Sequence, residues 1–179
     1  MVFIKSYLLC SLAIVVSLVT AAPTNSCPAG QTVFTQYNEG IIDASPYHVW
    51  QYIGEFFDVS WQGFELIGTT GKDNTPGATR TFSTLGLTLT ERLDQNIGST
   101  SWGPWQFFFQ QKFTLLGNPQ VAGASVTNVH DVLKVYPVWG GSKISWTVTG
   151  CANVTAIAQA VFDQVHGGAI QGTVTKFAS

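Results

Sequence analysis

The stretch from residue 41 to residue 93 constrains the fold more than any other part of this 179-residue chain. It opens on the apolar end of a strand, after which Asp43 or Ser45 can cap a helix whose first residue is Pro46. Apolar residues at helical spacing follow. A short second helix or turn comes next, and two alternating runs then flank Leu85-Gly86, which predicts a tight hairpin.

The rest of the chain continues as strands and ends as a helix. Alternation and turn residues predict about seven strands in all. Their expected ranges are 32–42, 64–69, 78–83, 87–93, 105–116, 126–135 and 142–149. From residue 153 the apolar spacing becomes helical up to residue 177, with Gly167, Gly168 and Gly172 suggesting a bend or a close contact. This order predicts an α+β domain.

The N-terminus has the features of a secretory signal. Lys5 gives a positive charge, residues 7–19 form an apolar run, and small residues at 19–22 suit cleavage. We expect residues 1–22 to be a signal peptide and residues 23–179 to be one secreted domain. An uncleaved membrane anchor is the alternative, but the run is shorter than the ~20 residues that a spanning helix needs. No other apolar run is long enough to cross a bilayer.

Charge and aromatic content point towards apolar partners. The 10 acidic and 8 basic residues are spread singly, without a basic run, which argues against nucleic acid or an anionic membrane surface as a partner. Six Trp and twelve Phe are more than a core of this size usually needs. Some of these rings are therefore expected to line a binding surface.

Two cysteines, Cys27 and Cys151, remain after Cys10 leaves with the signal peptide. An even pair in an oxidising secretory route predicts a disulfide, and two free buried thiols are the alternative. No histidine has zinc-like spacing to either cysteine, so no metal is expected. Asn153-Val154-Thr155 is an N-glycosylation acceptor at the start of the last helix.

The order of elements from residue 33 to residue 177 resembles the SRPBCC superfamily, which includes START domains, polyketide cyclase/dehydrase-like proteins, the birch-pollen-allergen family and the plant abscisic-acid receptors. The resemblance implies a helix-grip fold: a curved antiparallel sheet around a long C-terminal helix, with an internal apolar cavity. It also implies that the first and last strands are neighbours, which supports pairing of Cys27 with Cys151. The His-Arg-Leu latch of the hormone receptors is replaced by Leu116-Gly117-Asn118-Pro119, so their mechanism is not supported.

Strand parity predicts a charged pair on the inner face of the sheet. If the hairpin turns at Leu85-Gly86, Arg80 faces Glu91 and Phe82 faces Leu89. The pair is either a structural ion pair near the rim or a polar anchor for a ligand's carboxylate, hydroxyl or carbonyl. The resemblance favours the anchor, because the matching glutamate of the abscisic-acid receptors faces their cavity. Leu85 matches their mobile gate loop.

The remaining cavity candidates come from the aromatic strand and the last helix. Trp105, Phe107 and Phe109 share one face of the 105–116 run, and His166 could reach the cavity from the helix, whereas His48 and His130 form no visible dyad or triad. The full set of expected ligand-binding residues is Arg80, Phe82, Leu85, Leu87, Leu89, Glu91, Trp105, Phe107, Phe109 and His166.

Three functions are compatible with the sequence. The first is a secreted, monomeric carrier of an apolar small molecule such as a lipid, sterol or polyketide-like compound, without a cofactor. The second is a cyclase/dehydrase-type enzyme in which Glu91, Arg80 or a histidine moves protons. The third is a surface or defence-related protein with an incidental cavity. Because no nucleophile elbow or carboxylate pair stands out, the carrier is favoured and catalytic residues stay unassigned.

Overall fold

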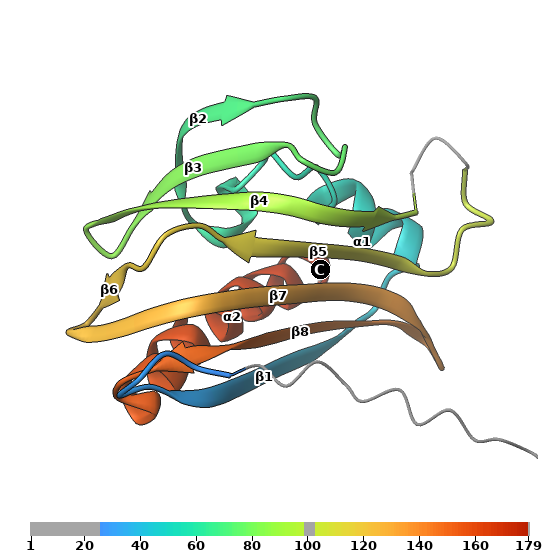
Figure 1. Cartoon of the computed structure of the whole chain (residues 1–179). Coiled ribbons are helices and arrows are strands. Elements are labelled where there is room, and N and C mark those ends of the chain that lie inside the picture. Colours follow the sequence, from blue (N-terminus) through green and yellow to red (C-terminus); the bar gives the residue numbers. More distant parts are fainter. Residues whose placement is uncertain (1–25, 99–102, 179) are drawn as a thin grey trace, which may run out of the picture.

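The computed structural model describes residues 26–98 and 103–178, so the expected signal peptide at residues 1–22 lies outside the described residues. Figure 1 shows one curved sheet with helices on its concave side. The elements in chain order are β1 (Thr32–Ile42), α1 (Pro46–Ile53), η1 (Ser60–Gln62), β2 (Glu65–Thr70), β3 (Thr79–Thr84), β4 (Leu87–Ile97), β5 (Phe109–Leu115), β6 (Gln120–Val121), β7 (Ala124–Val138), β8 (Gly141–Ala152) and α2 (Thr155–Phe177).

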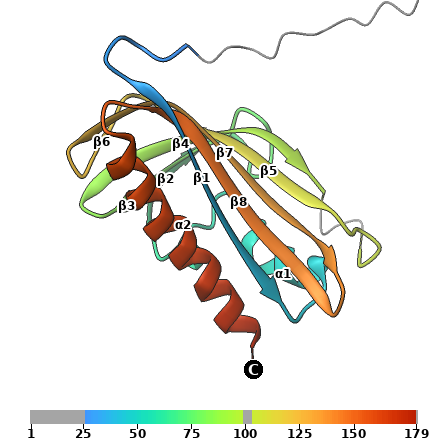
Figure 2. The same ribbon diagram turned by 90° about the horizontal axis from the view of Figure 1, so that it is seen from below.

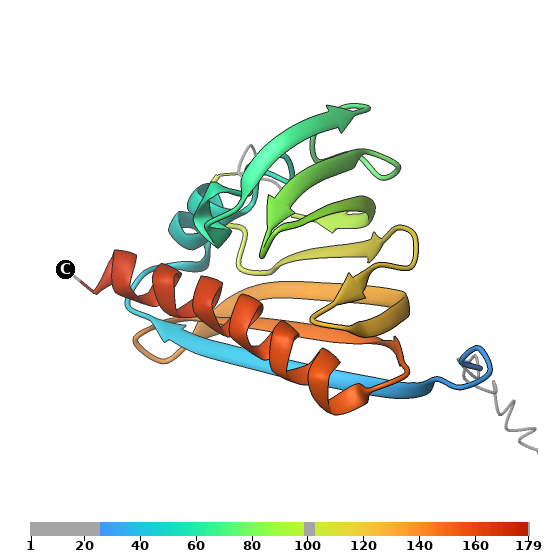
Figure 3. The same ribbon diagram turned by 90° about the vertical axis from the view of Figure 1, so that its left-hand side faces the viewer.

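The sheet is antiparallel, with strand order β1-β8-β7-β5-β4-β3-β2, and the short β6 pairs with β7. Strands β1 and β8 are neighbours although one opens the domain and the other precedes α2. Figures 2 and 3 show α2 lying across the concave face of the sheet, beside β1 and β8. This arrangement confirms the α+β helix-grip architecture.

Helix α1 fills one end of the concave face. The Ser45 hydroxyl caps it by accepting a hydrogen bond from the backbone N–H of His48, and Pro46 occupies its first turn. Trp50 is buried and its ring stacks on Phe109 of β5, with 5.2 Å between the ring centroids. Phe109 is therefore part of the core beneath α1.

Strand β5 is shorter than the sequence suggests, because the chain turns at Gly103, whose φ of 78° is left-handed, and the backbone N–H of Gln106 closes that turn. Trp105 and Phe107 precede the strand and are 81% and 58% exposed. The expectation that these two rings face the hollow is wrong. The alternation of residues along a segment assigns side chains to one face of a sheet only where the backbone is extended.

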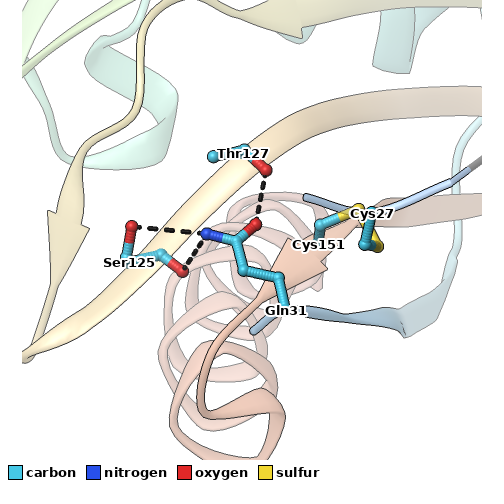
Figure 4. Close-up of a disulfide and its surroundings, with 5 residues drawn as sticks. All are labelled: Cys27, Gln31, Ser125, Thr127 and Cys151. Atoms are coloured by element: carbon cyan, nitrogen blue, oxygen red, sulfur yellow. Dashed lines mark hydrogen bonds between the residues drawn. A yellow bond between two sulfur atoms is a disulfide. The ribbon is translucent and has the colours of Figure 1, made fainter. Parts of the chain in front are cut away.

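A disulfide joins Cys27 to Cys151, with the two Cα atoms 5.6 Å apart (Figure 4). Cys151 lies within β8, one residue before its end, because β8 extends beyond the range 142–149 that the sequence predicts. Next to the bridge, the Gln31 side chain donates to Ser125 and accepts from the Thr127 hydroxyl at 2.6 Å. The disulfide and this amide together hold the start of β1 against β8 and β7.

The glycines of α2 have different environments. A Cβ at Gly167 would lie 3.1 Å from the side-chain nitrogen of Asn38 on β1, so this glycine allows a close approach. Gly168 and Gly172 have open space around them. The buried side of α2 includes two polar residues; it consists of Ala158, Phe162, His166, Ala169, Ile170 and Thr173.

Candidate functional site

The β3–β4 hairpin has the register that was expected from the alternation of inward- and outward-facing residues. Arg80 is opposite Glu91 and Phe82 is opposite Leu89. The turn consists of Leu85 and Gly86, both with positive φ (50° and 73°). Two successive left-handed residues are typical of the type I′ turn, whose twist matches that of the flanking strands. Leucine rarely adopts this conformation, and its side chain is 60% exposed.

All three side-chain nitrogens of Arg80 donate hydrogen bonds to protein groups. Its Nε and Nη2 donate to Oε2 of Glu91 at 2.8 and 2.7 Å, and Nη1 donates to the backbone carbonyl of Phe56 at 2.7 Å. The guanidinium carbon lies 4.4 Å from the ring centroid of Phe56 and 5.1 Å from that of Phe113. Arg80 is only 2% exposed, so its charge is both neutralised and shielded.

The loop between β2 and β3 helps to position this arginine. The Asn74 side-chain oxygen accepts from the backbone N–H of Phe56 at 3.0 Å and from the Gln111 amide at 3.2 Å. Asp73 accepts from the next backbone N–H, that of Phe57, at 3.0 Å. The carbonyl of Phe56 is thereby held where Arg80 can donate to it. In sequence this loop looks only like a polar turn, so its supporting role was not predicted.

A cavity lies between the β3–β4 hairpin, the middle of the sheet and α2. The space that the centre of a water-sized sphere can reach measures about 40 Å³, which is room for about three waters. Most of the lining is apolar, and its most buried polar residues, Glu91, Asp131 and His166, mark the inner end. The lining residues are Gln62, Phe64, Phe82, Thr84, Leu85, Leu87, Leu89, Glu91, Leu115, Val121, Asp131, Trp146, Val161, Phe162, Val165 and His166.

Six of the ten expected cavity residues line this space: Phe82, Leu85, Leu87, Leu89, Glu91 and His166. Arg80 faces inward but lies behind Glu91, and Phe109 lies in the core at α1. Trp105 and Phe107 lie outside the cavity lining. Five of the six hairpin candidates thus line the cavity, whereas none of the three candidates from the aromatic strand does, and ligand binding by any of them stays a prediction.

The inner end of the cavity holds a polar cluster that the sequence did not reveal. Asp131 of β7 is 2% exposed and accepts a hydrogen bond at 2.8 Å from the indole N–H of Trp146 on β8. The His166 ring stacks on Trp146, with 3.9 Å between centroids, and its Nε2 lies 3.6 Å from Asp131 Oδ1. That is longer than a normal hydrogen bond. No described residue is hydrogen-bonded to His166 Nδ1.

Burial shifts the pKa values of this cluster in opposite directions. It raises the pKa of the Asp131 carboxyl well above its usual range, and the nearby Glu91 charge raises it further. Burial raises the pKa of Glu91 as well, although Arg80 opposes this. Burial and the Arg80 charge together lower the pKa of His166 to about 3. With a pKa of about 3, His166 is therefore uncharged at neutral pH.

A bulge at Asn128 interrupts the alternation of inward- and outward-facing residues along β7. Asn128 has a φ of 51°, and the pairing of β7 with β8 shifts between Thr127 and His130. Beyond the bulge Asp131, Leu133 and Val135 are buried, while His130 points outward and its Nδ1 lies 2.9 Å from the Thr114 hydroxyl oxygen. Alternation within residues 130–135 alone would have placed Asp131 on the inner face.

No helix among residues 26–98 and 103–178 is long and apolar enough to cross a membrane. The same residues hold no cluster of three or more His, Cys, Asp or Glu side chains that could bind a metal ion.

A curved antiparallel sheet that wraps a C-terminal helix defines the helix-grip class, the SRPBCC superfamily. A family model described as a START domain matches residues 32–158. The chain therefore belongs to the START domain family. No curated protein matches the sequence.

Solved structures support the fold. A protein from Nitrosospira multiformis has a TM-score of 0.62 at 20% identity, covering 82% of this chain and 97% of its own. One from Bacillus thuringiensis has a TM-score of 0.58 at 17% identity, covering 83% and 100%. Ara h 8.0201 has a TM-score of 0.54 at 15% identity, covering 82% and 98%. At these identities the similarity shows the fold alone.

Proposed function

We propose that the protein is a secreted carrier that binds an apolar small molecule in the cavity between the β3–β4 hairpin and α2. The main support for this proposal is the composition of the cavity lining. Leucine, valine and phenylalanine side chains surround the space, and a few polar groups lie at its inner end. Ligand sites in proteins usually have this composition. The START-like fold agrees with a ligand-binding role.

The free space is small, so a ligand with more than a few atoms must move side chains at the mouth. The mouth residues suit such movement. Leu85 is 60% exposed in a strained turn, and Leu87, Val161 and Val165 are only half-buried. We expect the β3–β4 turn and the middle of α2 to separate when a ligand enters.

Native mass spectrometry of the secreted protein tests the carrier role, with a co-purifying apolar molecule as the expected result. Displacement of the uncharged dye N-phenyl-1-naphthylamine gives a second readout. Val165→Phe, which fills the cavity, should weaken dye binding at least tenfold. Gln171→Phe places the same ring on the exposed side of α2 and should not. A protein that is reproducibly empty and also binds no dye would contradict the proposal.

Proton-transfer catalysis is the second candidate, favoured by one observation. Asp131 and His166 line the same cavity and have pKa values displaced in opposite directions, as catalytic acid–base pairs often do. The test is to incubate any co-purified ligand with the protein and follow its mass. Conversion of the ligand to a product of different mass, or to an isomer, would identify an enzyme if His166→Phe abolishes that conversion. A ligand that stays unchanged would support the carrier role.

A further inference from the structure

We propose that the cavity selects an uncharged ligand with a hydroxyl group at its buried end, recognised by His166 and Asp131 and not by the Arg80–Glu91 pair. The inference rests on the proposed binding function and specifies its ligand class. It depends on which polar groups still have hydrogen-bonding capacity.

Arg80 is not placed to bind a ligand. All three of its side-chain nitrogens are hydrogen-bonded to Glu91 or Phe56, aromatic rings lie against its guanidinium, and it lies outside the cavity lining. Glu91 does line the cavity, but its charge is matched by Arg80. A ligand carboxylate would enter without a free cation to pair with and would lie near two acidic side chains. Burial of such an unpaired charge is costly.

His166 has capacity that the described protein does not use. Its ring is 5% exposed and lines the cavity, and Nδ1 has no hydrogen-bond partner among the described residues. An unpaired buried polar atom costs free energy that a ligand group can recover. Stacking on Trp146, with a centroid distance of 3.9 Å, fixes the plane of the ring. The direction in which Nδ1 can bond is therefore fixed too.

The preference for a ligand hydroxyl follows from the two tautomers that a neutral histidine can adopt. If Nε2 carries the proton, Nδ1 accepts; if Asp131 is protonated and its hydroxyl faces Nε2, Nδ1 donates. A ketone satisfies only the second state. A hydroxyl donates or accepts as required, so it satisfies both. The apolar walls formed by Leu87, Leu89 and Phe82 then contact the rest of the molecule.

Three small probes of one shape test the inference: p-cresol, p-xylene and p-toluate, which carry a hydroxyl, a methyl and a carboxylate at the same position. Binding is followed by NMR, through the methyl signals of Leu87, Leu89 and Val165 and the ring ¹⁵N signals of His166. We expect p-cresol to bind about three- to tenfold more tightly than p-xylene and to shift the His166 Nδ1 signal. The p-toluate anion should bind at least tenfold more weakly than p-cresol.

His166→Phe keeps an aromatic ring against Trp146 but removes both nitrogens, so it should abolish the preference for p-cresol over p-xylene. His48→Phe changes an exposed histidine on α1 and should leave that preference unchanged. Equal affinity of p-cresol and p-xylene in the wild-type protein would overturn the hydroxyl inference and leave the cavity proposal standing. If no probe moves the cavity methyl signals, the proposed binding function fails with it. Because the wild-type comparison needs no variant, a folding defect in His166→Phe does not affect it.

Discussion

Arg80 and Glu91 face each other across β3 and β4 and form a buried ion pair, with 2.7 Å between Nη2 and Oε2. Their side chains are 2% and 10% exposed. Directly after Glu91 on β4, Arg92 forms a second pair with Asp94 at 2.8 Å, but their side chains are 47% and 32% exposed. The same hairpin thus contains a buried pair and an exposed one of similar geometry.

Removal of one buried partner should be much more costly than removal of an exposed one. Glu91→Gln leaves the Arg80 charge buried and unpaired, so we expect the free energy of unfolding to fall by about 3–5 kcal/mol. Arg92→Ala should lower it by no more than about 1 kcal/mol. Urea denaturation of both variants measures the difference.

The double variant Arg80→Met/Glu91→Leu separates a structural pair from a binding group. Because it removes both charges together, it should recover most of the stability that Glu91→Gln loses. It should also keep its dye affinity if Arg80 and Glu91 are structural. A double variant that is stable but no longer binds the dye would instead identify the pair as the ligand anchor.

The Cys27–Cys151 disulfide links positions 124 residues apart. Replacing both cysteines by serine should lower the free energy of unfolding by about 2–5 kcal/mol, because the unfolded chain regains freedom. Thermal unfolding with and without reductant measures this loss in the wild-type protein. Thiol titration of the folded protein should detect no reactive cysteine, and two titratable thiols would contradict the bridge.

Two glycines should respond to alanine in opposite directions. At Gly40 of β1 a new Cβ would lie 2.8 Å from Ile170 Cγ2 and 2.9 Å from Val174 Cγ2, both on stiff β-branched side chains of α2. Gly40→Ala should therefore lower the melting temperature. Gly168 has open space, so Gly168→Ala should stabilise α2 by up to about 1 kcal/mol. The same thermal scan compares the two variants, and equal shifts would contradict the packing of α2 on β1.

The sequence predicted side-chain positions at this site correctly only where the strands are regular. The β3–β4 hairpin is free of bulges, so parity alone placed Arg80 opposite Glu91. The bulge at Asn128 interrupts the alternation of β7 before Asp131, and the turn at Gly103 places Trp105 outside the strand in which the sequence analysis expected it. Alternation also cannot show that Arg80 donates to a backbone carbonyl, since that carbonyl belongs to Phe56, 24 residues earlier in the chain. Element order was thus a better guide to the fold than to the contacts within the cavity.

The pH dependence of stability should depend on His166. Its pKa is about 3 in the folded protein because of burial and the Arg80 charge, against about 6.5 in an unfolded chain. Between these values the unfolded chain binds a proton that the folded protein does not. The free energy of unfolding should therefore fall as the pH is lowered from 7 to 4, by up to about 1.4 kcal/mol per pH unit.

Asp131 and Glu91, which line the same cavity as His166, oppose this trend. Their pKa values are raised in the folded protein, so the stability that they contribute is present at low pH and is lost as the pH rises. His166→Phe should therefore lose less stability than the wild-type protein between pH 7 and pH 4, and Asp131→Asn should lose more. Urea denaturation at each pH measures these slopes, with the exposed His48→Gln as the control. A wild-type slope that His166→Phe leaves unchanged would show that His166 is protonated in the folded protein as readily as in the unfolded chain.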